Sequence, residues 1–251
     1  MPHFSAPDGT ALYYDDQGDG DVVMLLHGFV GDINIDWIRS GILDRLLDEE
    51  HRVVAYDARG HGLSDKPHDP SAYENDAQTK DAQAVLDHLG IDDVVVVGFS
   101  MGARTALHLA AIDPRVRGVV ALGVGAPTPD AAATAFASNM SVPEAMLTDD
   151  PDSIEGDFVR SFRDMADAIH ADREALAAVM AAPRTEITSI AGELAVPVLV
   201  IAGVDDPAAP NPDALAATFA DGRALQTAGD HAGVKDQPDA HEAIVEFVAS
   251  L

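Results

Sequence analysis

The sequence has 251 residues and contains no cysteine, only three lysines and a single tryptophan. The absence of cysteine excludes disulfide bonds, thiolate metal sites and a cysteine nucleophile. No run of about 18 apolar residues occurs, so we expect no helix that spans a membrane. The segment Met1–Ser5 lacks a basic region followed by an apolar stretch. We therefore expect no secretory signal and a cytoplasmic location.

Basic residues are scarce as a class, with 15 Lys and Arg against 43 Asp and Glu and a formal net charge of −28. Such a surface repels phosphate backbones and anionic membranes, so we do not expect a nucleic-acid partner. The acids are spread along the whole chain, which indicates a solvated acidic shell. This shell has two interpretations. One is adaptation to high salt, where the screening length falls to about 3 Å at 1 M; the other is an ordinary acidic protein from a GC-rich genome.

Apolar runs of strand length alternate with amphipathic segments of helix length. The strand candidates are Val22–Leu26, His51–Tyr56, Val94–Val97, Val116–Leu122 and Val196–Ala202. The helix candidates are Ile35–Glu49, Asn75–Leu89, Ala103–Ala111, Asp213–Phe219 and Pro238–Leu251. Continuous apolar strands separated by helices are typical of a parallel sheet covered on both faces. We predict an α/β fold with a mostly parallel sheet of about eight strands, including a short one near Arg223–Gln226.

The N-terminal part has turn and loop signals of its own. Phe4–Asp16 reads as two strands around an Ala-Pro-Asp-Gly turn. The acidic run Asp15–Asp21 superficially resembles a calcium-binding loop, but an EF-hand loop begun at Asp15 needs an acid at its twelfth position, which is Leu26. We interpret this run as a hairpin loop.

Strand patterns disappear between about residues 127 and 194. Amphipathic, alanine-rich segments occur there instead, at 130–136, Ile154–His170 and Arg173–Met180. We predict that residues 1–126 and 195–251 form the α/β core and that residues 127–194 form a small helical lid inserted into it.

The chemistry centres on Gly98-Phe99-Ser100-Met101-Gly102, which fits the pattern G-x-S-x-G. In that pattern a serine lies on a tight turn from a strand into a helix, with its hydroxyl exposed to a site. An all-valine run precedes this serine and a helical pattern follows it, as the turn requires. Ser100 is therefore the candidate nucleophile.

A serine hydroxyl needs a neighbouring base, and histidine has a suitable pKa. Of the ten histidines, His231 lies in a small-residue loop after the last predicted strand, whereas His108 and His241 lie on helices. The segment Gly203-Val204-Asp205-Asp206-Pro207 directly follows the strand Val196–Ala202, and either aspartate can orient the histidine. The order serine, aspartate, histidine is the one expected for a serine on a strand-to-helix turn.

The oxyanion hole should combine the backbone N–H of Met101 with one from the loop after an earlier strand. His27-Gly28-Phe29 follows Val22–Leu26, so Phe29 is the second candidate donor. We expect His27 itself to pair with nearby backbone. No closely spaced set of His, Asp and Glu suggests a metal site, and no cofactor is expected.

These motifs together resemble the α/β-hydrolase family over essentially the full length of the chain, with serine esterases and lipases of the small-lid carboxylesterase type as the nearest likeness. The marks of the resemblance are His27–Phe29, Tyr56–Ser64, Gly98–Gly102, Asp206–Pro210 and the loop around His231. The resemblance favours Asp206 over Asp205 as the acid. It also implies a structural role for Arg59–Ser64. Because the residue on the turn is Ser100 and not aspartate, dehalogenase and epoxide-hydrolase chemistry are disfavoured.

We therefore expect a serine hydrolase that cleaves a small-molecule carboxylic ester through an acyl-enzyme. Perhydrolysis, C–C bond hydrolysis and acyl transfer by the same triad remain open alternatives, as does a non-catalytic ligand-binding receptor on the same fold. The natural substrate and the oligomeric state are not predicted.

Overall fold

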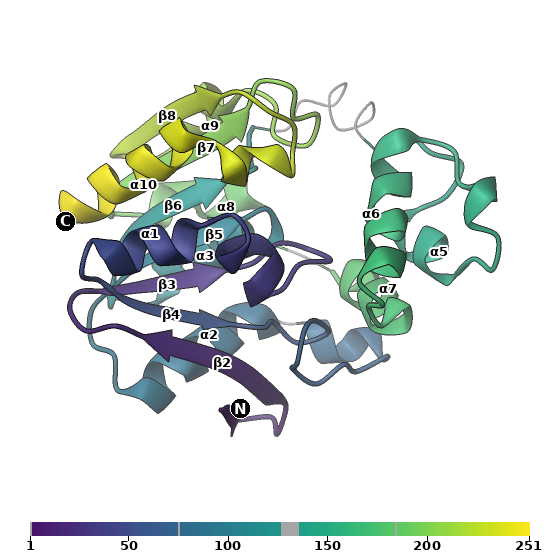
Figure 1. The fold of residues 1–251 in the computed structure, drawn as a ribbon, viewed down its shortest axis with the longest axis horizontal. Helices are drawn as coiled ribbons and strands as arrows, with labels where there is room; N and C mark the ends of the chain where they lie inside the picture. The colour runs from purple at the N-terminus through teal and green to yellow at the C-terminus, as the bar shows by residue number, and fades with distance from the viewer. Residues whose placement is uncertain (1, 75, 127–135, 184) are drawn as a thin grey trace.

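A computed structural model describes residues 2–74, 76–126, 136–183 and 185–251 (Figure 1). Its centre is one eight-stranded sheet with the strand order β1-β2-β4-β3-β5-β6-β7-β8. The strands are β1 (His3–Ser5), β2 (Ala11–Gln17), β3 (Val22–Leu26), β4 (Arg52–Tyr56), β5 (Val94–Phe99), β6 (Val116–Leu122), β7 (Val198–Gly203) and β8 (Gly222–Thr227). The predicted fold class is confirmed.

The sheet is parallel from β4 to β8, whereas β1 and β2 pair antiparallel at one edge. The continuous apolar runs form its middle, where every residue of β5 and of β7 is buried. This is the expected result when helices cover both faces of a strand, because no face is left for polar side chains.

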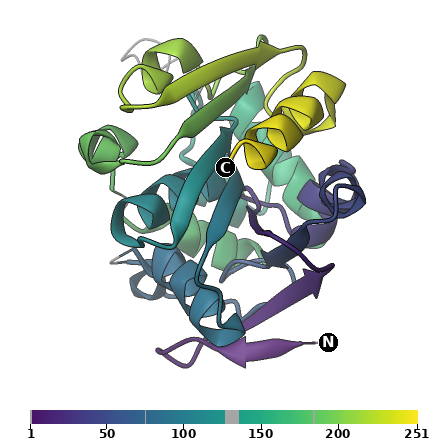
Figure 2. The ribbon, with the colours of Figure 1, turned by 90° about the vertical axis from the view of Figure 1, so that its left-hand side faces the viewer.

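Helices cover the sheet on both sides (Figure 2). On one side, α1 (Ile42–Asp48) and α10 (Pro238–Ala249) pack with Trp37 into a core cluster against the strands. On the other side, α2 (Ala77–Leu89), α3 (Met101–Ile112) and α9 (Pro212–Ala216) contribute to a second and larger cluster. Among the described residues, no helix combines the length and apolar character needed to cross a membrane.

Where it is described, the chain between β6 and β7 contains helices and connecting loops but no strand. It contains α5 (Val142–Leu147), α6 (Asp157–Ala168), α7 (Arg173–Ala181) and α8 (Ile187–Ile190), with short turns η3 (Pro151–Ser153) and η4 (Ala191–Glu193). Figure 1 shows α5, α6 and α7 grouped beside the end of the sheet toward which the β3 arrow points. Of the expected segment 130–136, residues 130–135 lie outside the described part of the chain.

Two local expectations were wrong. The helix expected over Ile35–Glu49 is two pieces, a π-helical turn η1 (Asn34–Ile38) and α1, because Gly41 has φ +81° and interrupts the helical conformation between them. The run Asp15–Asp21 is not a hairpin loop, because β2 pairs with β4 and β4 lies between β2 and β3.

Two further short turns are η2 (Pro70–Tyr73) and η5 (Gly233–Asp236).

Candidate active site

Ser100 lies on the turn that joins β5 to α3. Its backbone has φ +52° and ψ −107°, a conformation that costs energy for a residue with a side chain. The two flanking glycines are required by close approach. A Cβ at Gly98 would run into the carbonyl of Gly102, and one at Gly102 would run into the carbonyl of Leu26. The turn therefore presents the serine while its neighbours stay small.

Ser100, His231 and Asp206 form a chain of hydrogen bonds across three loops at the ends of strands. The Ser100 Oγ lies 2.9 Å from Nε2 of His231, and Nδ1 of His231 lies 2.8 Å from Oδ2 of Asp206. Since the carboxylate only accepts hydrogen bonds, Nδ1 carries the proton and Nε2 accepts from the serine hydroxyl. The other carboxylate oxygen accepts the N–H of Ala208 at 2.8 Å. The Asp206 side chain has no exposed surface, and that of His231 is 13% exposed.

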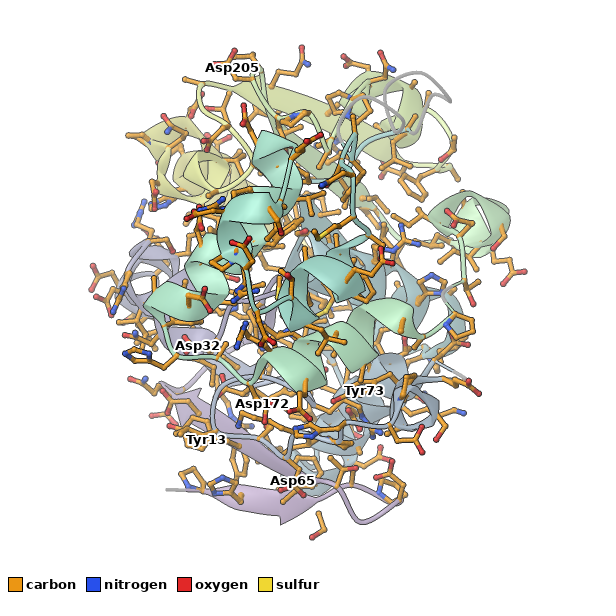
Figure 3. The ribbon with its side chains drawn as sticks, turned by 90° about the vertical axis from the view of Figure 1, so that its right-hand side faces the viewer. Tyr13, Asp32, Asp65, Tyr73, Asp172 and Asp205 are labelled. Carbon is orange, nitrogen blue, oxygen red and sulfur yellow. The ribbon has the colours of Figure 1, made fainter. Side chains whose placement is uncertain are left out.

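The neighbouring Asp205 does not join this chain. Its side chain is exposed, and it lies at the upper edge of the molecule in Figure 3. Its backbone N–H donates to the carbonyl of Gly229 at 3.1 Å, which ties the two loops that carry Asp206 and His231 together.

The candidate oxyanion donors border the same cavity as Ser100, since Phe29 and Met101 both line it. Within the described residues, neither backbone N–H donates to a protein acceptor, so both are available to a ligand. His27 pairs with backbone on both nitrogens. Its Nε2 accepts the N–H of Ala58 at 2.9 Å, and its Nδ1 donates to the carbonyl of Gly28 at 2.8 Å.

The other histidines considered from the sequence contact backbone. Nε2 of His108 lies 3.2 Å from the carbonyl of Thr185, and Nε2 of His241 lies 2.6 Å from that of Lys235. His61 is buried against His27, and this burial lowers its pKa to about 3, so the ring is neutral at neutral pH. Ser64 accepts the N–H of Tyr13 at 2.9 Å and is part of a structural turn.

The cavity over Ser100 has a volume of about 380 Å³ and a mostly apolar lining. The ring of Phe162 from α6 lines it, and the ring of Phe158 from the same helix lies against His231. Phe158 meets His231 edge to face with ring centroids 5.6 Å apart, and Phe162 meets Phe29 at 5.4 Å. Both phenylalanines lie in the amphipathic segment Ile154–His170 that the sequence predicts, but the sequence did not assign them to the site. Their spacing of four residues puts them on one helix face, and this spacing is the sequence feature that could have identified them as a pair.

Two charged residues on the cavity wall, Arg104 and Glu186, were missed from the sequence. Arg104 lies one helical turn after Ser100 on α3, so the i, i+4 relation could have identified it. Its Nη2 donates to the carbonyl of Thr185 at 3.0 Å and lies 3.9 Å from the carboxylate of Glu186. The cavity lining therefore combines apolar side chains with one guanidinium and one carboxylate. Over the described ranges, no group of three His, Asp or Glu side chains is arranged to hold a metal ion.

Comparison with known proteins defines the class to which this fold and site belong. A family model described as alpha/beta hydrolase fold matches residues 21–186. The chain belongs to this family, which confirms the resemblance seen in its motifs.

The chain is similar to three particular proteins of known function or structure. A solved enol-lactonase from Burkholderia xenovorans LB400 is 26% identical, with a TM-score of 0.76 over 99% of this chain and 100% of that one. A non-heme haloperoxidase from Rhodococcus erythropolis is 36% identical over 51% of this chain and 45% of its own length. An epoxide hydrolase from Caballeronia sordidicola is 35% identical over 47% of this chain and 36% of its own length. The chain thus spans less than half the length of these two curated relatives.

Proposed function

We propose that this protein is a serine hydrolase that cleaves a small-molecule carboxylic ester through an acyl-enzyme. The observation that carries the proposal is the unbroken hydrogen-bonded chain from Ser100 through His231 to Asp206, at the wall of a mostly apolar cavity. A histidine that accepts from a serine hydroxyl and donates to a buried carboxylate is arranged as a general base with a fixed tautomer.

In the proposed reaction, Ser100 attacks the ester carbonyl while His231 takes the serine proton. The carbonyl oxygen becomes an oxyanion and accepts hydrogen bonds from the N–H groups of Phe29 and Met101. Asp206 stabilises the imidazolium that forms. His231 then protonates the leaving alcohol as the ester C–O bond breaks. In the second half His231 takes a proton from water, which attacks the acyl-enzyme, and returns that proton to the Ser100 Oγ as the carboxylic acid leaves. The protein needs no other group for these steps.

The relatives support hydrolysis and leave its substrate open. A lactone is a cyclic ester, so the similarity to an enol-lactonase agrees with attack on an ester carbonyl. The similarity to an epoxide hydrolase carries less weight for the chemistry, because the turn residue here is Ser100 and not a carboxylate. Perhydrolysis is a second candidate, favoured by the similarity to a haloperoxidase, and it uses the same triad with peroxide as the acceptor.

We also propose that residues 127–194 act as a lid over the cavity. Two contacts support this role, since Phe158 and Phe162 of α6 touch the rings of His231 and Phe29. The residues on the cavity wall then favour a small or medium apolar acyl group.

The test combines covalent labelling with a substrate series. We expect a fluorophosphonate to label Ser100 in the wild type, and p-nitrophenyl esters of short acyl chains to be hydrolysed. Replacing Ser100→Ala should abolish both while the thermal unfolding midpoint stays close to that of the wild type, because the change removes only one oxygen. Adding peroxide and monitoring peracid formation with the same enzyme tests the second candidate. Ester hydrolysis that persists in the Ser100→Ala variant would refute the proposal.

A further inference from the structure

Asp36 and Lys235 form an ion pair in the interior, next to the segments that carry the candidate site. Their side chains are 1% and 7% exposed, although the residues are 199 positions apart in the chain. One of only three lysines in the sequence is therefore buried in an interior ion pair. Buried ion pairs add little net stability, because desolvating both charges offsets their attraction. Stability alone does not account for this pair.

The carboxylate of Asp36 holds the loop that carries Phe29. Its Oδ2 accepts the backbone N–H of Gly28 at 2.7 Å, and its Oδ1 accepts from the ammonium of Lys235. Peptide groups are planar, so this bond fixes the peptide unit before Gly28. The next peptide unit contains the Phe29 N–H, and its carbonyl accepts from Nδ1 of His27. The Gly31 N–H donates to the same Gly28 carbonyl at 3.1 Å. Because glycine constrains its own dihedral angles least, these bonds supply the rigidity that Gly28 lacks.

The ammonium of Lys235 reaches the other two parts of the site. It lies 4.3 Å from the centre of the Phe99 ring, and Phe99 directly precedes Ser100. The same ring lies 5.1 Å from the ring of His231. Lys235 follows His231 by four residues, and its own carbonyl accepts from Nε2 of His241 on α10. One buried cation thus contacts or adjoins the oxyanion loop, the serine turn and the histidine loop.

We infer that Asp36 is a positioning residue for the Phe29 N–H and that Lys235 holds Asp36 and the Phe99 ring in place for it. This inference rests on the proposed serine-hydrolase function. Its consequence is that the pair contributes to stabilising the oxyanion in the transition state, and not to binding the ground-state ester.

The test compares two double variants in which no buried charge is left unpaired. Asp36→Leu with Lys235→Met replaces the pair by apolar side chains and removes the acceptor of the Gly28 N–H. Asp36→Asn with Lys235→Met removes the charges but keeps an oxygen that can accept this N–H. We expect the first variant to lose about 100-fold in kcat, as misplacement of a catalytic group does, with KM within about twofold of wild type. The second variant should lose less in kcat, about fivefold to tenfold, because its amide oxygen still accepts the Gly28 N–H and the Phe29 N–H is misplaced less.

A transition-state mimic separates positioning from general damage. A boronic acid adds to the serine hydroxyl as a tetrahedral anion, so its affinity should fall by the same factor as kcat/KM in each variant. Asp113→Asn is the matched control. Asp113 is 3% exposed and paired with Arg115 at 2.6 Å, just before β6 begins and so at the opposite end of that strand from the site. This control should lower the unfolding midpoint and leave kcat unchanged.

The possible results are distinct. A folded Asp36→Leu/Lys235→Met variant with wild-type kcat overturns the inference, and so does a loss that appears in KM alone. If that variant does not fold, the Asp36→Asn/Lys235→Met variant decides, since unchanged kcat there contradicts the role and a fivefold loss at constant KM supports it. An inactive, unlabelled wild type would instead refute the proposed function itself, and the inference would fall with it.

Discussion

At the scale of single residues, the two adjacent aspartates differ completely in their surroundings. Asp206 is buried with both carboxylate oxygens engaged, one by His231 and one by the N–H of Ala208. Asp205 has an exposed side chain. The position after the strand left both residues as candidates, since a one-residue shift turns the side chain in another direction, and only the family resemblance favoured Asp206.

Replacing each of these aspartates by asparagine should separate their roles. We expect Asp206→Asn to lower kcat by about 10⁴-fold, because an amide can hold the histidine in the wrong tautomer. Asp205→Asn should change kcat by less than about twofold, in line with the small effect of exposed substitutions. Steady-state kinetics on a p-nitrophenyl ester measures both, and circular dichroism checks the fold. If Asp205→Asn lost more kcat than Asp206→Asn, the carboxylate of Asp205 would be the one that orients the histidine in solution.

At the scale of elements, the sequence predicted the strands of the sheet better than the helices. The run Val94–Val97 is buried on both faces, so its composition alone specifies a central strand. The helix α5 was not predicted from the sequence, although Ser141 and Glu144 form a capping box at its start. The break at Gly41 was also missed, because periodic apolar residues continue across it.

Contacts between elements that are distant in the chain could not be predicted from the sequence, for a different reason. The order of strands cannot be read from a local pattern, so the insertion of β4 between β2 and β3 was not foreseen. The pairing of Asp36 with Lys235 depends in the same way on how η1 and η5 meet in space. Ser100 and His231, in contrast, each lie just after a predicted strand, and parallel strands deliver such residues to a common edge of the sheet.

The helix α6 offers a prediction about acyl-chain selection. Phe162 lines the cavity and packs on Phe29, so Phe162→Ala should enlarge the space over Ser100. We expect kcat/KM for the acetate ester to fall about tenfold and the preferred acyl chain to lengthen, because each methylene of pocket complementarity is worth about 1–3 kcal/mol. A series of p-nitrophenyl esters from acetate to octanoate measures the shift.

The control for this prediction is an aromatic residue outside the cavity. Phe4 of β1 stacks on His88 with ring centroids 4.7 Å apart. Phe4→Ala should lower stability and leave the order of preference among the esters as in the wild type. An unchanged order in Phe162→Ala would show that α6 does not limit the acyl chain.

At the scale of the whole molecule, the excess of acids is a property of the surface. Five aspartates and no glutamate are buried among the described residues. Many of the basic side chains are already committed to ion pairs, such as Arg52 with Asp16 and Arg160 with Asp164. Most of the net charge of −28 is therefore solvated and unneutralised, and it repels itself.

This charge distribution leads to a salt-dependent stability. We expect the unfolding midpoint to rise by about 10 °C between 10 mM and 1 M KCl, roughly 3 kcal/mol for a chain of this size. The physical reason is screening, since the Debye length falls from about 30 Å to about 3 Å over this range. The control is the same titration close to the isoelectric point of about 4.3, where net charge nearly vanishes and the salt effect should shrink. An unfolding midpoint that does not change with salt at neutral pH would rule out adaptation to high salt. The acidity would then be that of an ordinary acidic protein from a GC-rich genome.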